Sequence, residues 1–203
     1  MTRIVEFVFD FASPNCYLAY KALGSYPGLA SADIQLTPCL LGGIFKATGN
    51  QPPMAAFAGV KGKLDYEMLE IRRFCAAHGL DKFTFNPHFP INTLALMRGL
   101  IAAEIENCKT PYIEAVLAAM WEDGKNMNDP ALFVAVLTDA GLDADMLLAK
   151  SQSPDVKQKL IDNTADAVAR GVFGLPAFFI ADEMYFGKDR LGQIDAAIAA
   201  DPI

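Results

Sequence analysis

Hydrophobic positions near the start of the chain form two strand-like segments with a helix signal between them. Residues 4–11 are rich in β-branched and aromatic side chains, which is typical of a buried strand. Ser13 and Pro14 follow as an N-cap and a first helical residue, and they predict a helix that ends near Tyr26. Residues 33–38 alternate in polarity and predict a second strand. The opening is therefore expected to be a β-α-β unit.

The middle of the chain has a helical pattern. Residues 41–58 are rich in Gly, Asn and Pro and predict a loop around one short helix at residues 40–48. From residue 63 to residue 170, apolar positions recur at helical spacing, which predicts about five or six helices and almost no strand. Helix starts are expected at Asn92 or Thr93, Thr110-Pro111, Asp129-Pro130 and Ser153-Pro154.

Strand character returns near the end of the chain. Residues 177–180 and 184–186 predict a hairpin, and a last helix is expected over residues 190–200 with Asp189 as its cap. The order β-α-β, helices, β-β-α is the thioredoxin plan with an inserted helical block. We expect an α/β fold with two parts. Residues 1–60 and 171–203 would form a thioredoxin-like domain, and residues 61–170 an all-helical insertion domain.

Composition narrows the possible partners and environment. The chain has 203 residues and a formal net charge of −7, which argues against a nucleic acid or an anionic membrane surface as partner. No apolar stretch reaches the roughly 18 residues of a transmembrane helix, and the start lacks a signal-peptide pattern. The four cysteines are widely spaced without a C-x-x-C pair. We therefore expect no disulfide framework, no metal site and a cytoplasmic location.

The candidate chemistry lies at Ser13-Pro14-Asn15-Cys16, directly after the first strand. In a thioredoxin plan this is the place of a C-x-x-C motif, at a helix N-terminus that favours negative charge. A serine there cannot exchange disulfides, but it can donate a hydrogen bond to a thiolate brought by another molecule. Two alternatives stay open: Ser13 is a plain cap, as expected at Ser153, or Cys16 acts as a single redox thiol.

Two later segments favour the role of Ser13 as a hydrogen-bond donor to a thiolate over these two alternatives. Gly174-Leu175-Pro176 precedes the third strand, where a thioredoxin plan has a cis proline facing the first helix and a backbone that pairs with a peptide-like ligand. Residues 185–190 place a glycine and charges at the start of the last helix. A plain strand-entry proline and a turn with an Asp cap are the simpler interpretations of these segments.

Five segments together resemble a known family. FDFASPNCYLAY (residues 9–20) is similar to the opening of 2-hydroxychromene-2-carboxylate isomerases and kappa-class glutathione transferases, and residues 40–50, 63–74, 85–99 and 171–191 continue the resemblance. The resemblance implies a DsbA-like architecture, a homodimer and glutathione as cofactor. It implies Ser13 as the catalytic residue. The implied glutathione contacts are Ser13, Asn50, Lys63, Leu175, Pro176, Phe186, Gly187, Lys188 and Asp189. The implied substrate contacts are Lys46, Asn50, His88 and Trp121, with the loop of residues 85–90 nearby.

The resemblance also implies a reaction. A glutathione thiolate stabilised by Ser13 would isomerise an aromatic unsaturated keto acid by reversible addition. Three other functions stay open: a kappa-like transferase or peroxidase acting on other electrophiles, a single-thiol redox protein using Cys16, and a glutathione-binding module without turnover.

Overall fold

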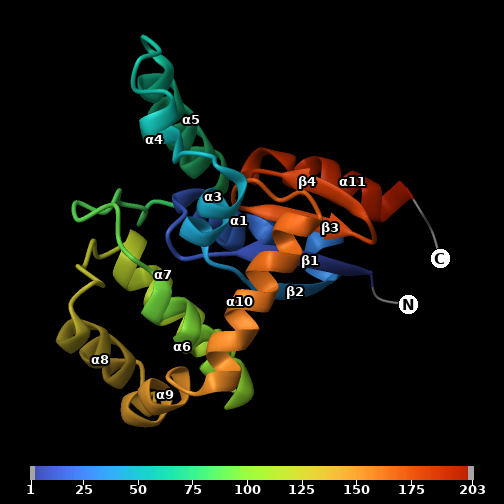
Figure 1. The fold of residues 1–203 in the computed structure, drawn as a ribbon. Helices are drawn as coiled ribbons and strands as arrows, with labels where there is room; N and C mark the ends of the chain where they lie inside the picture. Colours follow the sequence, from blue (N-terminus) through green and yellow to red (C-terminus); the bar gives the residue numbers. More distant parts are fainter. Residues whose placement is uncertain (1–2, 201–203) are drawn as a thin grey trace.

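The computed structural model describes residues 3–200 and contains one mixed sheet of four strands (Figure 1). Its order is β2-β1-β3-β4, formed by β1 (Ile4–Phe9), β2 (Asp33–Pro38), β3 (Ala177–Ile180) and β4 (Glu183–Phe186). β1 pairs with β2 in parallel and with β3 antiparallel, and β3 pairs antiparallel with β4. The predicted β-α-β opening and the late hairpin are confirmed.

Helices surround this sheet and fill the middle of the chain. They are α1 (Pro14–Ala22), α2 (Pro27–Ser31), α3 (Leu41–Thr48), α4 (Pro53–Ala56), α5 (Lys63–His78), α6 (Leu94–Ile105), α7 (Lys109–Trp121), α8 (Pro130–Asp139), α9 (Ala144–Ser151), α10 (Pro154–Ala169) and α11 (Leu191–Ala200), with 3-10 turns η1 (Leu23–Ser25) and η2 (Lys188–Arg190). The helical block is confirmed. The proposed division at residues 60/61 and 170/171 stays a prediction, since α10 packs on both the helices and the sheet.

Several predicted boundaries were wrong. The first helix ends at Ala22, and the 3-10 turn η1 lies where the helix was expected to continue to about Tyr26. The short helix α2, which follows, was not predicted. The last helix begins at Leu191, because Asp189 belongs to η2. α7 begins at Lys109 rather than at Thr110-Pro111. A proline in the first turn is tolerated there, because the N–H that it lacks has no intrahelical acceptor at that position.

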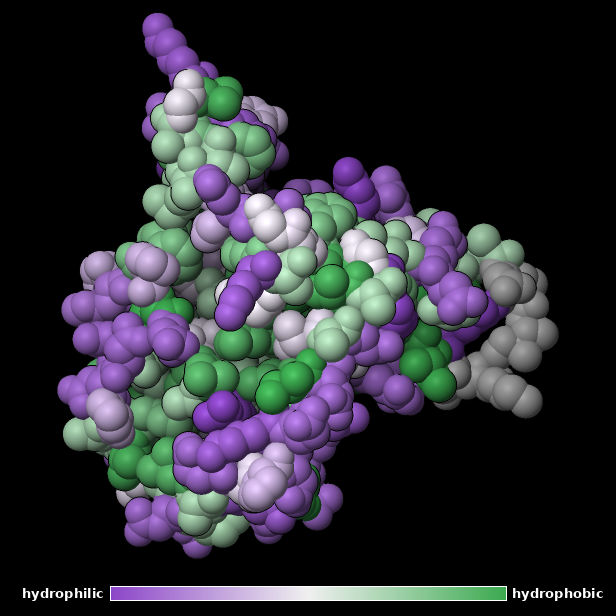
Figure 2. Space-filling model, in the orientation of Figure 1, coloured by the Kyte–Doolittle hydropathy of each residue, from purple (hydrophilic) through white to green (hydrophobic). Residues whose placement is uncertain are grey.

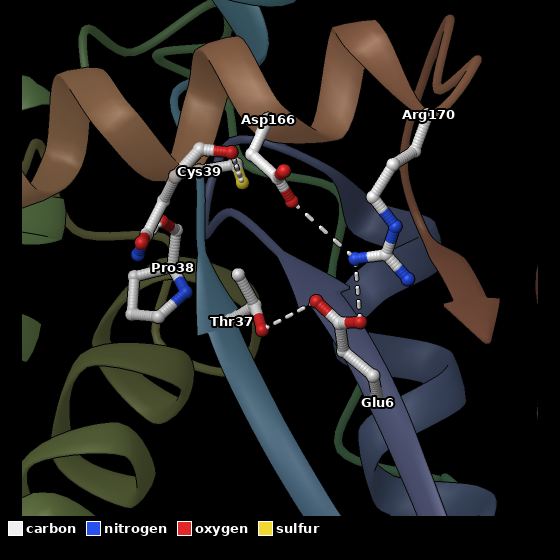
Figure 3. Close-up of polar contacts among 7 residues, drawn as sticks. Glu6, Thr37, Pro38, Cys39, Asp166 and Arg170 are labelled. Atoms are coloured by element: carbon white, nitrogen blue, oxygen red, sulfur yellow. Dashed lines mark hydrogen bonds and ion pairs between the residues drawn. The ribbon is translucent and has the colours of Figure 1, made fainter. Parts of the chain in front are cut away.

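The two faces of the sheet carry different helices. Phe7 and Phe9 lie on the face covered by α1, where Phe7 stacks on Phe178 and Phe9 meets Tyr20. The other face carries α10 (Figure 3). There Glu6 accepts hydrogen bonds from the Arg170 guanidinium and from the Thr37 hydroxyl, at 2.7 Å each.

Further contacts hold α10 at this face. The Arg170 guanidinium lies 3.7 Å from the centre of the Phe179 ring, and the Cys39 thiol donates to the Asn163 carbonyl at 3.3 Å. Charged hydrogen bonds and a cation–π contact thus fix the end of the inserted segment to the sheet.

α6 lies among the other helices and is buried on most of its surface. Gly99 is required in it, because a Cβ there would lie 2.1 Å from the Tyr112 hydroxyl, which donates to the Leu96 carbonyl. α4 and α5 project from the body (Figure 1), and Figure 2 shows this projection as largely apolar below a hydrophilic tip. Within residues 3–200, no helix has the length and apolar character to cross a membrane.

Candidate active site

Ser13 is the N-cap of α1 and is only 4% exposed. Its Oγ accepts the Cys16 N–H at 3.3 Å, and its hydroxyl donates to the Leu175 carbonyl at 3.0 Å. Pro14 is the first helical residue, as predicted, and the first turn contains no acidic side chain. The positive end of the helix dipole is therefore not neutralised by its own helix. A group placed beside Ser13 meets a hydroxyl donor at an electropositive helix start.

The Leu175–Pro176 segment faces this helix start. The peptide bond between the two residues is cis, as predicted. The Pro176 carbonyl accepts the Gly187 N–H at 2.9 Å, which connects the segment to the end of β4. Within residues 3–200, the Leu175 N–H makes no hydrogen bond, although the residue is only 6% exposed. This main-chain donor is available to a peptide-like ligand.

The turn between β4 and α11 contributes a buried cation. Gly187 has φ +95°, a conformation that glycine adopts readily. Lys188 is 5% exposed, and its Nζ lies 2.7 Å from Asp189 Oδ1 and 5.1 Å from the centre of the Phe74 ring on α5. The Asp189 side chain remains 63% exposed. Lys188 therefore places a buried positive charge, paired with Asp189, beside α5, and it follows directly on Gly187, whose N–H binds the Pro176 carbonyl.

Phe186 belongs to an exposed aromatic pair beside the same segment. Its ring centre lies 4.4 Å from that of Phe173, and both rings are more than 40% exposed. A Cβ at Gly174 would lie 3.2 Å from the Phe186 ring, so the ring packs directly on the chain that leads into Leu175.

The connection between β1 and α1 is anchored by the helical segment. Trp121 is fully buried, and its indole N–H donates to the Phe11 carbonyl at 2.9 Å. Trp121 therefore has no exposed atom with which to contact a substrate directly. It can affect a bound substrate only by positioning the residues that pack on it. Asp10, which the sequence reasoning missed, is fully buried beside this connection. Burial raises the pKa of its carboxyl to about 6, against the hydrogen bonds that it accepts.

Cys16 lies one turn into α1 and is fully buried. Burial raises the pKa of its thiol far above the ordinary value, with a smaller opposing effect from hydrogen bonds. The reactive form of a cysteine is the thiolate. The geometry therefore gives Cys16 little thiolate and no access for a disulfide partner.

The remaining predicted residues lie on exposed or half-exposed surface. Lys46 and Asn50 are exposed on and after α3, and His88 is exposed in the loop before α6. Lys63 begins α5, forms an ion pair with Glu67, and has its Nζ 5.3 Å from the centre of the Phe57 ring. Within residues 3–200, no hydrogen bond or ion pair joins these side chains to Ser13. The predicted residues that the structure brings together are Ser13, Leu175, Pro176, Phe186, Gly187, Lys188 and Asp189.

A surface hollow of about 390 Å³ lies between α5 and the segment that follows it. Phe83 in its wall packs on Tyr17, with ring centres 5.6 Å apart. Tyr17 follows Ser13 by one helical turn and therefore lies on the same side of α1. The other lining residues are mostly apolar, with charge at the rim: Met68, Ile71, Arg72, Cys75, Ala76, Leu80, Asp81 and Phe85.

Comparison with known protein families agrees with this architecture. A family model described as a DSBA-like thioredoxin domain matches residues 4–199. The chain belongs to the DsbA-like thioredoxin family. The matched residues include the helix start after β1, the inserted helices between β2 and β3, and the cis proline. The predicted fold class is confirmed.

Within the DsbA-like family, this chain belongs with two groups of enzymes. It is 30% identical to 2-hydroxychromene-2-carboxylate isomerase of Sphingobium xenophagum, over 97% of this chain and 98% of that protein. It is also 30% identical to glutathione S-transferase kappa 1 of Rattus norvegicus, over 93% of this chain and 88% of that protein. A solved structure of a 2-hydroxychromene-2-carboxylate isomerase superposes with a TM-score of 0.81 at 28% identity, covering 97% of this chain and 95% of that one. The predicted family is confirmed.

Proposed function

We propose that this protein is a glutathione-dependent isomerase of the 2-hydroxychromene-2-carboxylate type, with Ser13 as its catalytic residue. The observation that carries the proposal is the Ser13 hydroxyl, which lies at the start of α1 and is hydrogen-bonded to the carbonyl beside cis-Pro176. This is the position where a thioredoxin plan has its reactive sulfur. A hydroxyl at this position can donate a hydrogen bond to a sulfur that a bound ligand supplies.

The residues around Ser13 fit glutathione, which is a peptide with negative charge. The Leu175 N–H has no hydrogen-bond acceptor within residues 3–200 and suits the carbonyl of a peptide. In the first turn of α1, the buried Asn15 Oδ1 has no hydrogen-bond partner among those residues and suits an N–H donor. Lys188 and the helix start supply positive charge for the carboxylates. Phe186, Gly187 and Asp189 complete the proposed binding segment.

The energy needed to ionise the bound thiol is within reach of these groups. Lowering a thiol pKa from about 8.5 to about 6.5 requires roughly 2.7 kcal/mol. A hydrogen bond to a charged partner contributes about 1.5–3 kcal/mol, and a helix N-terminus about 0.3–1 kcal/mol. Ser13 and the start of α1 together can therefore account for the shift.

The role of Ser13 in this proposal is to donate a hydrogen bond and not to attack. Its hydrogen-bond partners within residues 3–200 are main-chain groups, and none of them is a base that could take its proton. When bound, glutathione supplies a thiolate that adds reversibly to the unsaturated keto acid and permits rotation about the former double bond. The hollow beside Phe83 and Phe85, with Arg72 at its rim, suits an aromatic carboxylate.

A kappa-class-like transferase or peroxidase is the second candidate, favoured by the similarity to the rat enzyme. The two functions are separated by assays of the purified protein with a hydroxychromene carboxylate and with a general electrophile, each with and without glutathione. Isomerisation that requires glutathione but does not consume it supports the first. Stoichiometric consumption of glutathione supports the second. Turnover without glutathione contradicts both and favours a redox role for Cys16.

The substrate contacts and the dimer belong to the same proposal. Four of the predicted residues make no contact with Ser13 in the single chain. We propose that they line the outer part of the site: Lys46, Asn50, Lys63 and His88. The α4–α5 projection exposes Met54, Phe57, Val60 and Tyr66, which supports a homodimer formed through this surface. Light scattering of the wild type and of Phe57→Asp tests the dimer. A wild-type monomer would contradict it.

A further inference from the structure

Asp10 lies between β1 and α1, three positions before Ser13, and has no exposed surface. Its Oδ1 accepts the Ala12 N–H at 2.9 Å and the Thr93 hydroxyl at 2.6 Å, and its Oδ2 accepts the Leu41 N–H at 2.7 Å. Its main-chain carbonyl accepts the Ser13 N–H at 3.2 Å. One residue therefore shapes the turn into Ser13 and ties that turn to the starts of α3 and α6.

In the part of the chain that the structure describes, no cation balances the charge of Asp10. Within residues 3–200, no basic side chain pairs with it. The titratable groups that face it are the thiols of Cys16 on α1 and Cys39 after β2, and burial raises the pKa of both. A buried carboxylate without a cation costs stability. Such a cost is typical of residues kept for a site and not for the core.

We propose that Asp10 is a positioning residue for Ser13: its carboxylate holds the turn of residues 10–13 against α3 and α6, so that the Ser13 hydroxyl meets the ligand sulfur at the start of α1. Thr93 takes part in this arrangement. It stands at the N-cap of α6 and makes no side-chain cap bond, and its hydroxyl donates to Asp10. The effect of Asp10 on the ionisation of the ligand sulfur rests on the proposed function. Its effect on the structure of the turn does not.

The two possible effects of the Asp10 charge on a bound thiol have opposite signs. Through space, a negative charge disfavours a nearby thiolate, so that its removal would lower the thiol pKa. Through position, loss of the carboxylate would loosen Ser13 and raise the thiol pKa. Asp10→Asn preserves the size of the side chain but turns an NH₂ group toward at least one of the three donors that Asp10 now satisfies.

The test is a double-mutant cycle on the thiol pKa of bound glutathione, followed by ultraviolet titration. We expect Asp10→Asn to raise this pKa by about half a unit or more, which is a threefold or larger loss of ionisation. The same substitution in a Ser13→Ala background should not raise the thiol pKa further, because the positioning effect of Asp10 acts through Ser13. Thr93→Val removes one of the three bonds and should give a smaller rise, which keeps the test available if Asp10→Asn does not fold.

Thr37→Val is the matched control. It removes a threonine–carboxylate hydrogen bond of 2.7 Å to Glu6 on the α10 face of the sheet (Figure 3), and it should leave the thiol pKa unchanged. Amide hydrogen exchange of the ligand-free protein provides a readout that needs no glutathione. We expect Asp10→Asn to accelerate exchange at Ala12, Ser13 and Cys16 by about tenfold or more, and Thr37→Val to leave it unchanged.

Three results would overturn the inference: a lowered thiol pKa in Asp10→Asn, an equal effect of Asp10→Asn with and without Ser13, or unchanged exchange at the turn. If the wild type binds no glutathione, the proposed function fails. The exchange rates then still decide whether Asp10 holds the turn.

Discussion

The Ser13 hydroxyl and the Leu175 carbonyl lie 3.0 Å apart although 162 positions separate them in the sequence. The contact joins the first helix to the cis-proline segment and occupies the hydroxyl proton. A ligand thiolate that accepts the Ser13 hydrogen bond in place of the Leu175 carbonyl replaces a neutral acceptor with a charged one. Hydrogen bonds to charged acceptors are roughly twice as strong as neutral ones, so the exchange favours the thiolate.

Cys16→Ala is expected to retain most glutathione-dependent turnover. The Cys16 thiol lies on the buried side of α1 and packs as a small apolar group, so its removal should cost about 1 kcal/mol of stability. Steady-state turnover with and without glutathione checks this expectation. Cys39→Ala, which removes another buried thiol, is the control. A folded but inactive Cys16→Ala protein would support the redox function instead.

The predictable part of the site consists of local signals. Ser13 and Pro14 cap a helix through contacts within one turn, and the pattern around Leu175-Pro176 precedes a short strand, so both are visible in the sequence. Asp10 and Trp121 are different. Thr93, which binds Asp10, is 83 positions away, and Phe11, whose carbonyl binds Trp121, is 110 positions away. A pattern within a short window of sequence cannot indicate a contact between residues so far apart in the chain.

Parts of the fold were also not predictable from local sequence patterns. α2 has five residues, which is too short for a helical repeat to be visible. The start of α7 was misplaced because Thr-Pro resembles a cap, whereas the helix had already begun at Lys109. The β-branched and aromatic strands and the long amphipathic stretches were predictable, since their pattern repeats over many residues.

Lys188→Met is expected to weaken glutathione binding by about tenfold with little change in stability. The substitution preserves packing on Phe74 and removes the charge, while Asp189 stays solvated. Calorimetric titration and thermal unfolding measure the two quantities. Lys109→Met, which removes a surface lysine paired with Glu104, should change neither. Equal glutathione affinity in Lys188→Met would remove this residue from the site.

Lys63→Ala is expected to weaken glutathione binding by about 1–3 kcal/mol, as for a lost hydrogen bond between charged groups. Calorimetry of the variant checks this value. Lys150→Ala is a suitable comparison, because Lys150 also lies beside a glutamate on a helix surface. If both variants bind glutathione as the wild type does, Lys63 plays no part in binding.

Asp10 predicts a pH dependence of stability. Burial raises the pKa of its carboxyl from 3.8 to about 6. Between these values the folded state holds a proton that the unfolded state has released, so this contribution to stability is present below pH 4 and is lost as the pH rises through about 6. The free energy of unfolding of the wild type minus that of Asp10→Asn should therefore be about 2 kcal/mol larger at pH 4 than at pH 7. Denaturant unfolding of both proteins at the two pH values measures it, and an equal difference at both would contradict the burial argument.

The most direct test of the whole account is the ultraviolet titration of the thiol in the glutathione complexes of the wild type, Ser13→Ala and Ser153→Ala. Ser153 caps α10 through the Val156 N–H and is followed by a proline, so it caps its helix in the same way as Ser13. We expect Ser13→Ala to raise the thiol pKa by about one unit or more through loss of a charge-assisted hydrogen bond. Ser153→Ala should lose a similar cap and leave the thiol pKa unchanged. A Ser13→Ala complex that titrates like the wild type would show that Ser13 is only a helix cap and would contradict the proposed mechanism.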